Sequence, residues 1–278
     1  MVRFGRSIYK TAEELRRMVL PGQITAASLA AVRDAVRPGI TTLELDRIAE
    51  DTIRSLGGAP NFMLEPGYRH TLCTSVNDEV VHGIPGSRVL QPGDLLSVDS
   101  GAVAGGWNGD AAFSVVAPAP SQPELVAART ALADVTEHAL WVGIAALASA
   151  RRLNEVGAAI EDAVAERGDY GTLEEYVGHG IGRAMHEEPP VYNYRVRGNS
   201  PAIKPGLVVA IEPMVVAGSI GTHVLDDDWT VVTDDGADAA HFEHTVAVHA
   251  SGIWVLTAPD GGAAGLAPFG VEPVPIGG

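Results

Sequence analysis

The 278-residue sequence predicts an α+β protein with two related halves, each of which packs helices on an antiparallel sheet. Three observations predict this fold class. Helical patterns occur in both halves, strand patterns follow them, and the strand pattern of the first half recurs in the second. Hydrophobic residues make up 46% of the chain, which is enough for one large core or two small ones.

The first predicted elements are two helices with capping boxes. Thr11 and Glu14 begin the first helix, which a Pro-Gly pair stops. Pro21 falls inside this helical pattern and is expected to kink or split it. Thr41 and Glu44 begin the second helix, which a Gly-Gly pair ends.

Strands follow an irregular segment. Residues 59–88 are rich in Gly, Pro, Asn and Ser, which predicts loops and short strands. The turn-forming "AGGWNG" then joins "LLSVDSGAV" to "DAAFSVVA", which predicts a β-hairpin. Residues 122–150 and 151–168 predict two further helices, and three strand-like segments follow: "LVVAIEPMVV", "WTVVTDDG" and "FEHTVAVHA".

Two segments of the first half have counterparts in the second. "IAEDTIRSLG" is similar to "AIEDAVAERG", and "LQPGDLLSVDSG" is similar to "IKPGLVVAIEPM". Because both recur in the same order at nearly the same offset, residues of about 40–120 and 150–258 are predicted to be duplicated halves of one domain spanning 1–258. Coincidence is the alternative, since Pro-Gly before a strand is common. The Pro/Gly/Ala-rich segment 259–278 is predicted to be a flexible tail.

Each half places two acidic residues in its strands. Asp99 and Glu212 interrupt apolar strands, and Asp110 and Glu243 lie on a later strand of each half. An unpaired carboxylate buried there costs several kcal/mol, and no run of Lys or Arg lies nearby in sequence. If the halves face each other about a pseudo-two-fold axis, the four acids meet at one centre, where two divalent cations would neutralise them.

Nine histidines are present, and five are interpreted as surface or satisfied core residues: His70, His138, His223, His241 and His249. His82, His179 and His186 instead lie in Gly- or Pro-bounded motifs that indicate close backbone approach. His244 adjoins Glu243 and should face the opposite way in a strand. Four carboxylates and one imidazole favour Mn, Fe or Co, with Zn as a further option, and two histidines remain to act on a substrate.

The composition argues against several partners and compartments. A formal charge of −16 offers no basic face to nucleic acid. The longest uncharged apolar run has 12 residues, whereas a membrane span needs about 20. The single cysteine, Cys73, excludes an internal disulfide, and the N-terminus lacks the apolar core of a secretory signal. Together these features predict a cytoplasmic protein with no membrane partner.

Five motifs resemble those of type I methionine aminopeptidases, metallopeptidases of the pita-bread fold. They occur in the family's order and with its spacing over residues of about 10–257: "SVNDEVVHGIP", "DLLSVDSGAVAGGWNGDAAFSV", "GHGIGRAMHEEP", "VVAIEPM" and "AHFEHTVAV". The resemblance implies a central dinuclear metal site with two divalent ions (Co, Mn, Fe or Zn). It also implies removal of the initiator methionine from chains whose second residue is small.

The resemblance assigns metal-binding roles position by position. It implies that Asp99 binds one metal through both oxygens and that Asp110 and Glu243 bridge the pair. His179 and Glu212 complete the coordination. Glu212 is also implied to transfer a proton from the attacking water.

The resemblance further assigns residues to the substrate. His82 and His186 are implied to contact the scissile peptide and stabilise the tetrahedral intermediate. The implied methionine pocket consists of Phe62, Tyr68, Cys73, Met185 and Trp229. Thioether contacts with aromatic rings favour methionine modestly over aliphatic side chains. As an alternative, Trp229 is a core residue.

The sequence departs from the family pattern at four positions. Val81 and Val177 replace frequent cysteines and are interpreted as packing changes, and Met185 replaces an aromatic residue. Glu65 also replaces an aromatic residue, so its carboxylate is expected to turn to solvent or to pair with Arg69. Side-chain specificity is therefore less firmly predicted than catalysis.

Alternative functions differ in what the sequence should contain. A proline-directed peptidase of the same fold usually carries a separate N-terminal domain, whereas about 40 residues precede the repeat here. An inactive binding scaffold should have lost a metal ligand, yet all five are present. An aminopeptidase with altered N-terminal residue specificity is a further alternative. The expected partners are N-termini of nascent polypeptides and peptides, met near the ribosome by a monomeric enzyme.

Overall fold

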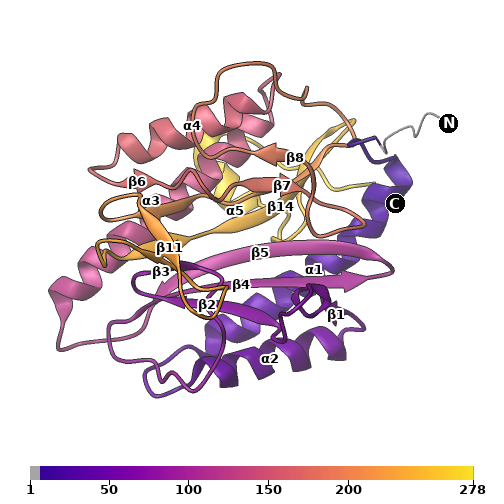
Figure 1. The fold of residues 1–278 in the computed structure, drawn as a ribbon. Coiled ribbons are helices and arrows are strands. Elements are labelled where there is room, and N and C mark those ends of the chain that lie inside the picture. Colours follow the sequence, from indigo (N-terminus) through magenta and orange to yellow (C-terminus); the bar gives the residue numbers. More distant parts are fainter. Residues whose placement is uncertain (1–6, 278) are drawn as a thin grey trace.

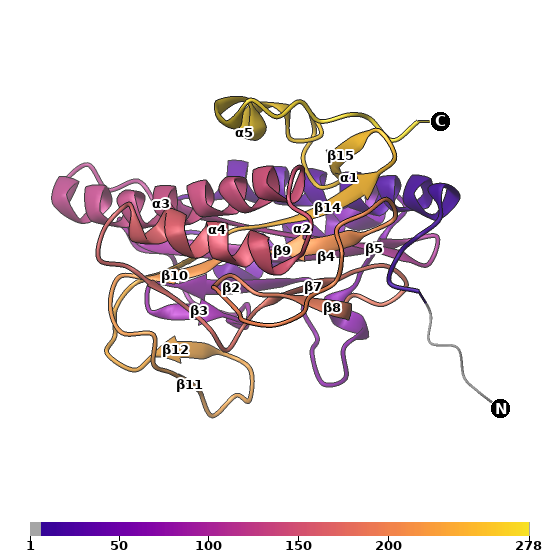
Figure 2. The same cartoon turned by 90° about the horizontal axis from the view of Figure 1, so that it is seen from above.

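The computed structural model describes residues 7–277 as a layer of helices on an antiparallel sheet (Figure 1). The long helices are α1 (Ala12–Ala35), α2 (Thr42–Ser55), α3 (Pro123–Leu147) and α4 (Asn154–Ala165). Figure 2 shows them side by side over one face of the strands. The fold class predicted from the sequence is confirmed.

The strands form one large sheet and two small ones. Their bounds are β1 (Ala59–Pro60), β2 (Leu72–Val76), β3 (Glu79–Val81), β4 (Leu95–Ala104), β5 (Trp107–Val116), β6 (Gly171–Thr172), β7 (Gly178–Gly180), β8 (Glu187–Val191), β9 (Val208–Ile211), β10 (Met214–Val216), β11 (Thr222–Val224), β12 (Val231–Thr233), β13 (Ala239–His241), β14 (Glu243–His249) and β15 (Gly252–Val255). The nine-stranded sheet has the order β1-β4-β5-β14-β9-β7-β8, with β2 on β4 and β15 on β14. The small sheets are β13-β10-β6 and β11-β12-β3.

The two halves meet in the middle of the large sheet. Strand β5 of the N-terminal half pairs with β14 of the C-terminal half, and Glu243 lies opposite Ala112. The Thr245 hydroxyl closes this junction because it donates to the Asp110 carbonyl at 2.7 Å and accepts from the Asp110 N–H at 3.0 Å. The acids of both halves therefore lie close to a hydrogen-bonded seam.

Both capping boxes are present, at Thr11 with Glu14 and at Thr41 with Glu44. The expectation that Pro21 splits the first helix is wrong, because α1 runs through it as one element. The helix packs closely on the segment that contains Leu256 at this point, because a Cβ at the next residue, Gly22, would lie 2.5 Å from the Leu256 carbonyl oxygen. This tight packing outweighs the local cost of placing a proline in a helix.

The segment after residue 258 differs from the predicted flexible tail. It forms α5 (Ala263–Leu266) and the 3₁₀ turn η2 (Ala267–Phe269), and Leu266 is fully buried in the main core. Figure 2 shows α5 on the outer side of the helix layer, where it contacts α3. The Val274 N–H then donates to the Ile253 carbonyl at 2.9 Å. A few apolar residues thus hold a segment whose composition resembles a linker.

Within residues 7–277, none of the helices combines the length and the apolarity that crossing a membrane requires.

Candidate active site

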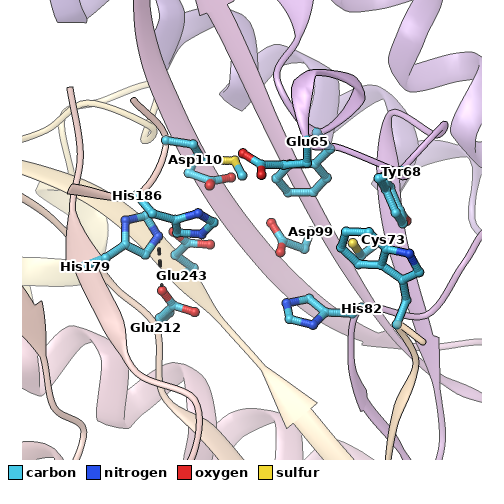
Figure 3. Close-up of a pocket in the computed structure, with 13 residues that line it drawn as sticks. Glu65, Tyr68, Cys73, His82, Asp99, Asp110, His179, His186, Glu212 and Glu243 are labelled. Atoms are coloured by element: carbon cyan, nitrogen blue, oxygen red, sulfur yellow. Dashed lines mark ion pairs between the residues drawn. The ribbon is translucent and has the colours of Figure 1, made fainter. Parts of the chain in front are cut away.

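One cavity between the halves gathers all the residues that the sequence nominates for a site. Its volume is about 160 Å³, which suits one side chain and the adjoining peptide rather than a larger ligand. Its lining is drawn in Figure 3 and consists of Phe62, Glu65, Tyr68, Cys73, His82, Asp99, Asp110, His179, Met185, His186, Glu212, Trp229 and Glu243. Only Glu65 in this set is not among the predicted site residues.

The N-terminal half presents its two acids from a hairpin with a fixed register. Asp99 lies in the middle of β4, and Asp110 lies on β5 opposite Gly101. Residues two apart on a strand share a face, so both carboxylates point into the cavity. The two glycines of the turn have φ of 58° and 73°, as a two-residue turn of matching twist requires. The turn therefore fixes the register that brings the two acids together.

The C-terminal half presents its acids from strand ends. Glu212 comes directly after the last residue of β9, and Glu243 is the first residue of β14. The two strands pair so that His244 lies opposite Ile211, which puts the neighbouring acids close together. The amide of Asn193 donates to the Glu212 carbonyl at 3.0 Å and holds the chain where it leaves the strand.

Burial perturbs all four acids. It raises the pKa of Asp99 to about 7. The pKa values of Asp110, Glu212 and Glu243 also lie well above their ordinary range, first because of burial and then because the acids repel one another. A cluster of this kind holds protons unless a cation replaces them.

The donor set fits divalent cations. Among the described residues, one carboxylate oxygen of each of Asp99, Asp110 and Glu243 is buried without a hydrogen-bond partner. Two groups bring one ligand atom from each member within 4.8 Å of one another: Asp110 with His179 and Glu243, and Glu212 with His241 and Glu243. Within residues 7–277, Glu212 is the one acid of the four that has ion-pair contacts, and both of its partners are histidines. Oxygen-rich sites with one or two imidazoles suit first-row divalent metals.

His179 has the geometry of a metal ligand. Its Nδ1 lies 2.9 Å from the Gly180 carbonyl, to which it donates, so the lone pair is on Nε2. Nε2 lies 3.4 Å from Glu212 Oε1, the contact drawn as a dashed line in Figure 3. Side chains are excluded at both flanking glycines, because a Cβ at Gly178 or Gly180 would approach a backbone oxygen to 2.4 or 2.2 Å. The glycine-rich motif thus allows the strand to come close enough to deliver the imidazole.

His82 and His186 reach the cavity from different halves. His82 has a φ of 62°, a strained conformation for a side-chain-bearing residue that is frequent at functional sites. Burial lowers the pKa of His82 to about 4, and it also lowers the pKa of His186. The ring of His186 lies 4.4 Å from the ring of His179. His82 and His186 are therefore neutral near pH 7, and each has one N–H to donate.

The other end of the cavity is apolar. Its walls form one packed cluster of Phe62, Tyr68, Cys73, Met185 and Trp229. The Tyr68 and Trp229 rings meet edge to face at 4.9 Å, and the Tyr68 hydroxyl donates to the Leu72 carbonyl at 2.6 Å. The tyrosine is thereby satisfied internally and presents only its ring. Trp229 is partly buried, packs against this cluster and lines the cavity.

Glu65 does not behave as expected. Within residues 7–277 it forms no ion pair with Arg69, and its half-buried side chain lines the cavity. Figure 3 shows its carboxylate directed inward. Burial lowers the pKa of His186, and the Glu65 charge opposes that shift. An acidic group therefore lies beside a substrate-facing histidine.

His241 is the residue that the sequence interpretation missed. The sequence pattern indicates an ordinary core or surface histidine, whereas its Nε2 lies 3.7 Å from Glu212 Oε2 and has no hydrogen-bond partner within residues 7–277. Burial lowers its pKa to about 3. Its place two residues before Glu243, on the same face of an extended chain, was the available signal. By contrast, His244 faces away as predicted and lies 2.9 Å from the Thr257 hydroxyl.

Comparisons with known proteins agree with this arrangement. The family model described as metallopeptidase family M24 matches residues 16–250. "Methionine aminopeptidase 1" of Bacillus subtilis is 43% identical over 250 residues, covering 90% of this chain and 98% of the relative. "Methionine aminopeptidase 1" of Mycobacterium tuberculosis is 45% identical over 254 residues, covering 89% and 94%.

Solved structures are similar over the same region. The crystal structure of methionine aminopeptidase from Thermotoga maritima matches with a TM-score of 0.84 and 36% identity, covering 92% of this chain and 99% of that one. Prolidase from Pyrococcus furiosus matches with a TM-score of 0.68 and 20% identity, covering 90% of this chain and 65% of that one. The second similarity supports the shared fold only.

Proposed function

Because the chain belongs to metallopeptidase family M24 and to its methionine aminopeptidases, we propose that it removes the initiator methionine from nascent polypeptides and peptides with a small second residue. One observation carries the proposal. A single cavity has a cluster of acids and imidazoles at one end and an apolar pocket at the other. A chain end fits this shape if its first side chain enters the apolar pocket while its amine and first peptide bond reach the cluster.

The proposed ligands of two divalent cations are Asp99, Asp110, His179, Glu212 and Glu243. When bound, the cations supply a water of lowered pKa and polarise the scissile carbonyl. Co, Mn, Fe and Zn all suit this donor set. The buried carboxylates that hold protons in their absence are then ionised.

Side chains of the cavity carry out proton transfer, stabilise the oxyanion and exclude water. Glu212 accepts a proton from the attacking water and passes it to the leaving amine. His82 and His186 are neutral because burial lowers their pKa values, so each can donate an N–H to the oxyanion that develops. Phe62, Tyr68 and Trp229 exclude water from the first side chain and offer ring edges to a thioether.

We also propose a setting for the reaction. The substrate would be the emerging chain, met in the cytoplasm near the ribosome, and the charge of −16 disfavours nucleic acid as a partner. The proposed acting species is a monomer. No membrane partner is proposed.

The test is release of methionine from Met-Ala-Ser, Met-Leu-Ser and Leu-Ala-Ser by protein stripped with a chelator and reloaded with each metal at one and two equivalents. Met-Ala-Ser should be cleaved at least about 10²-fold faster than the other two, which corresponds to about 3 kcal/mol of discrimination. Glu212→Gln should lose at least about 10³-fold in rate, while Glu124→Gln on the exposed start of α3 should not change it. Equal cleavage of the leucine-first peptide, or full activity of Glu212→Gln, would contradict the proposal.

A further inference from the structure

The carboxylate of Glu212 lies between two imidazoles, one on each oxygen. His179 Nε2 is 3.4 Å from Oε1, and His241 Nε2 is 3.7 Å from Oε2. Only the first of these histidines was expected in the site. The second is 2% exposed, and its Nε2 is buried without a partner among residues 7–277. A buried polar atom left without a partner costs about 1–3 kcal/mol, so Nε2 needs a hydrogen-bond or metal partner.

The two imidazoles are held in different ways. Nδ1 of His179 donates to the Gly180 carbonyl, which leaves Nε2 as a lone pair suited to a metal. Within residues 7–277, no backbone carbonyl holds the His241 ring in the same manner. Nothing therefore forces a lone pair onto His241 Nε2, and that atom can be the N–H of the neutral ring.

The backbone of His241 is rigidly placed. Its N–H donates to the Ser114 hydroxyl at 2.9 Å, and that hydroxyl donates back to the His241 carbonyl at 2.9 Å. On the other side, β13 pairs with β10 so that His241 lies opposite Met214. Both halves of the chain thus fix this residue, and its ring has little freedom to move away from Glu212.

We propose that His241 is a positioning residue: its Nε2–H donates to Oε2 of Glu212 and thereby directs Oε1 toward His179, where the two side chains would serve as metal ligands. A small rotation of the glutamate side chain shortens the contact from 3.7 Å to an ordinary hydrogen bond of about 2.9 Å. The inference rests on the proposed role of Glu212 as a ligand. Outer partners of this kind typically change metal affinity or activity by about 10–100-fold.

The first experiment compares His241→Ala, His241→Gln and wild type by calorimetric titration with Mn²⁺ and by steady-state kinetics on Met-Ala-Ser. His241→Ala should weaken metal binding about 10-fold and lower kcat about 10–100-fold, with KM changed less than about 3-fold. His241→Gln keeps an N–H donor and should recover most of both losses. His223→Gln is the matched control, because that histidine is exposed and pairs with Asp234 outside the cavity.

The second experiment uses wild-type protein and so does not depend on folding of a variant. Two-bond ¹H–¹⁵N spectra of histidine-labelled protein, loaded with Zn²⁺ and assigned by difference with His241→Gln, should show His241 as the Nε2–H tautomer. The Nδ1–H tautomer would instead leave a lone pair on Nε2, as a direct metal ligand requires.

Three outcomes would overturn the inference. They are the Nδ1–H tautomer at His241, which marks it as a direct ligand, wild-type metal affinity in His241→Ala, and wild-type kcat in His241→Ala. Each is distinguishable from failure of the proposed function, which would leave Glu212→Gln active or methionine unselected.

Discussion

The two halves of the molecule contribute two carboxylates each to the cavity, but they hold them differently. In the N-terminal half, Asp99 and Asp110 are short side chains in the middle of long paired strands. In the C-terminal half, Glu212 and Glu243 are longer side chains at the ends of β9 and β14. The imidazoles next to the acids, those of His179 and His241, both come from the C-terminal half.

This difference shows two ways in which a carboxylate can be held so that it points into the cavity, one within a strand ladder and one at a strand end. A ladder fixes the direction of every side chain, so an aspartate in it needs no further contact to point inward. A glutamate at a strand end has more freedom, and side chains around it must restrict that freedom. Asn193 on the Glu212 carbonyl and the two histidines on its carboxylate supply this restriction.

The largest expected effect comes from neutralising one acid of each half. Asp110→Asn and Glu243→Gln should each lower kcat/KM by at least about 10³-fold, because each removes one of the five proposed metal ligands. Metal content by atomic absorption should fall below two equivalents in both variants. The matched controls, Asp51→Asn and Glu124→Gln on exposed helix positions, should match wild type. If only one half proves sensitive, the equal division of the site between the halves is wrong.

The sequence predicted the parts of the site that local rules determine. Apolar strands interrupted by Asp99 or Glu212 indicate a buried charge, and a Gly-Gly turn fixes the register of the first pair. The helix starts followed from capping boxes for the same reason. Such signals depend on a few neighbouring residues, so one sequence is enough to find them.

What the sequence did not predict depends on contacts between distant segments. The spacing of His241 from Glu243 hints at a shared face, but its closeness to Glu212 is seen only in the folded chain. Leu266 lies in a linker-like composition, and its burial becomes visible only when the segment meets α3. The inward direction of Glu65 likewise follows from the path of a loop rather than from its residues.

A second, smaller effect tests a feature that lies outside the two repeated halves. Helix α3, which connects them, is covered by α5, and Leu266 is the buried residue of α5. Leu266→Ala should destabilise the fold by about 3 kcal/mol, or roughly 6–10 °C in Tm, because it leaves a cavity in the core. Leu64→Ala is the control, since that side chain is 67% exposed and should change Tm by less than about 2 °C. An unchanged Tm in Leu266→Ala would restore the flexible tail predicted from composition.

The smallest effect concerns the N-terminal half without its metal. The folded-state pKa of Asp99 is raised from 3.8 to about 7, so folding favours the protonated carboxyl. Its stabilising contribution is fully present below pH 3.8 and is lost as the pH rises through about 7. Chelator-treated protein should therefore be less stable at pH 8 than at pH 5, relative to a variant that cannot ionise at this position.

Asp99→Asn provides that variant. Without metal it should exceed wild type at pH 8 by about 2 kcal/mol, or roughly 4–8 °C in Tm, and the difference should shrink toward pH 4. With saturating Mn²⁺ the order should reverse, because the ionised aspartate binds the cation that stabilises the folded state and the amide does not. Differential scanning fluorimetry from pH 4 to 8, with and without metal, measures the sign of the Tm difference between Asp99→Asn and wild type under each condition. If Asp99→Asn is less stable than wild type under every condition, this carboxyl is a structural hydrogen-bonding group, and the strand ladder alone does not explain its place in the site.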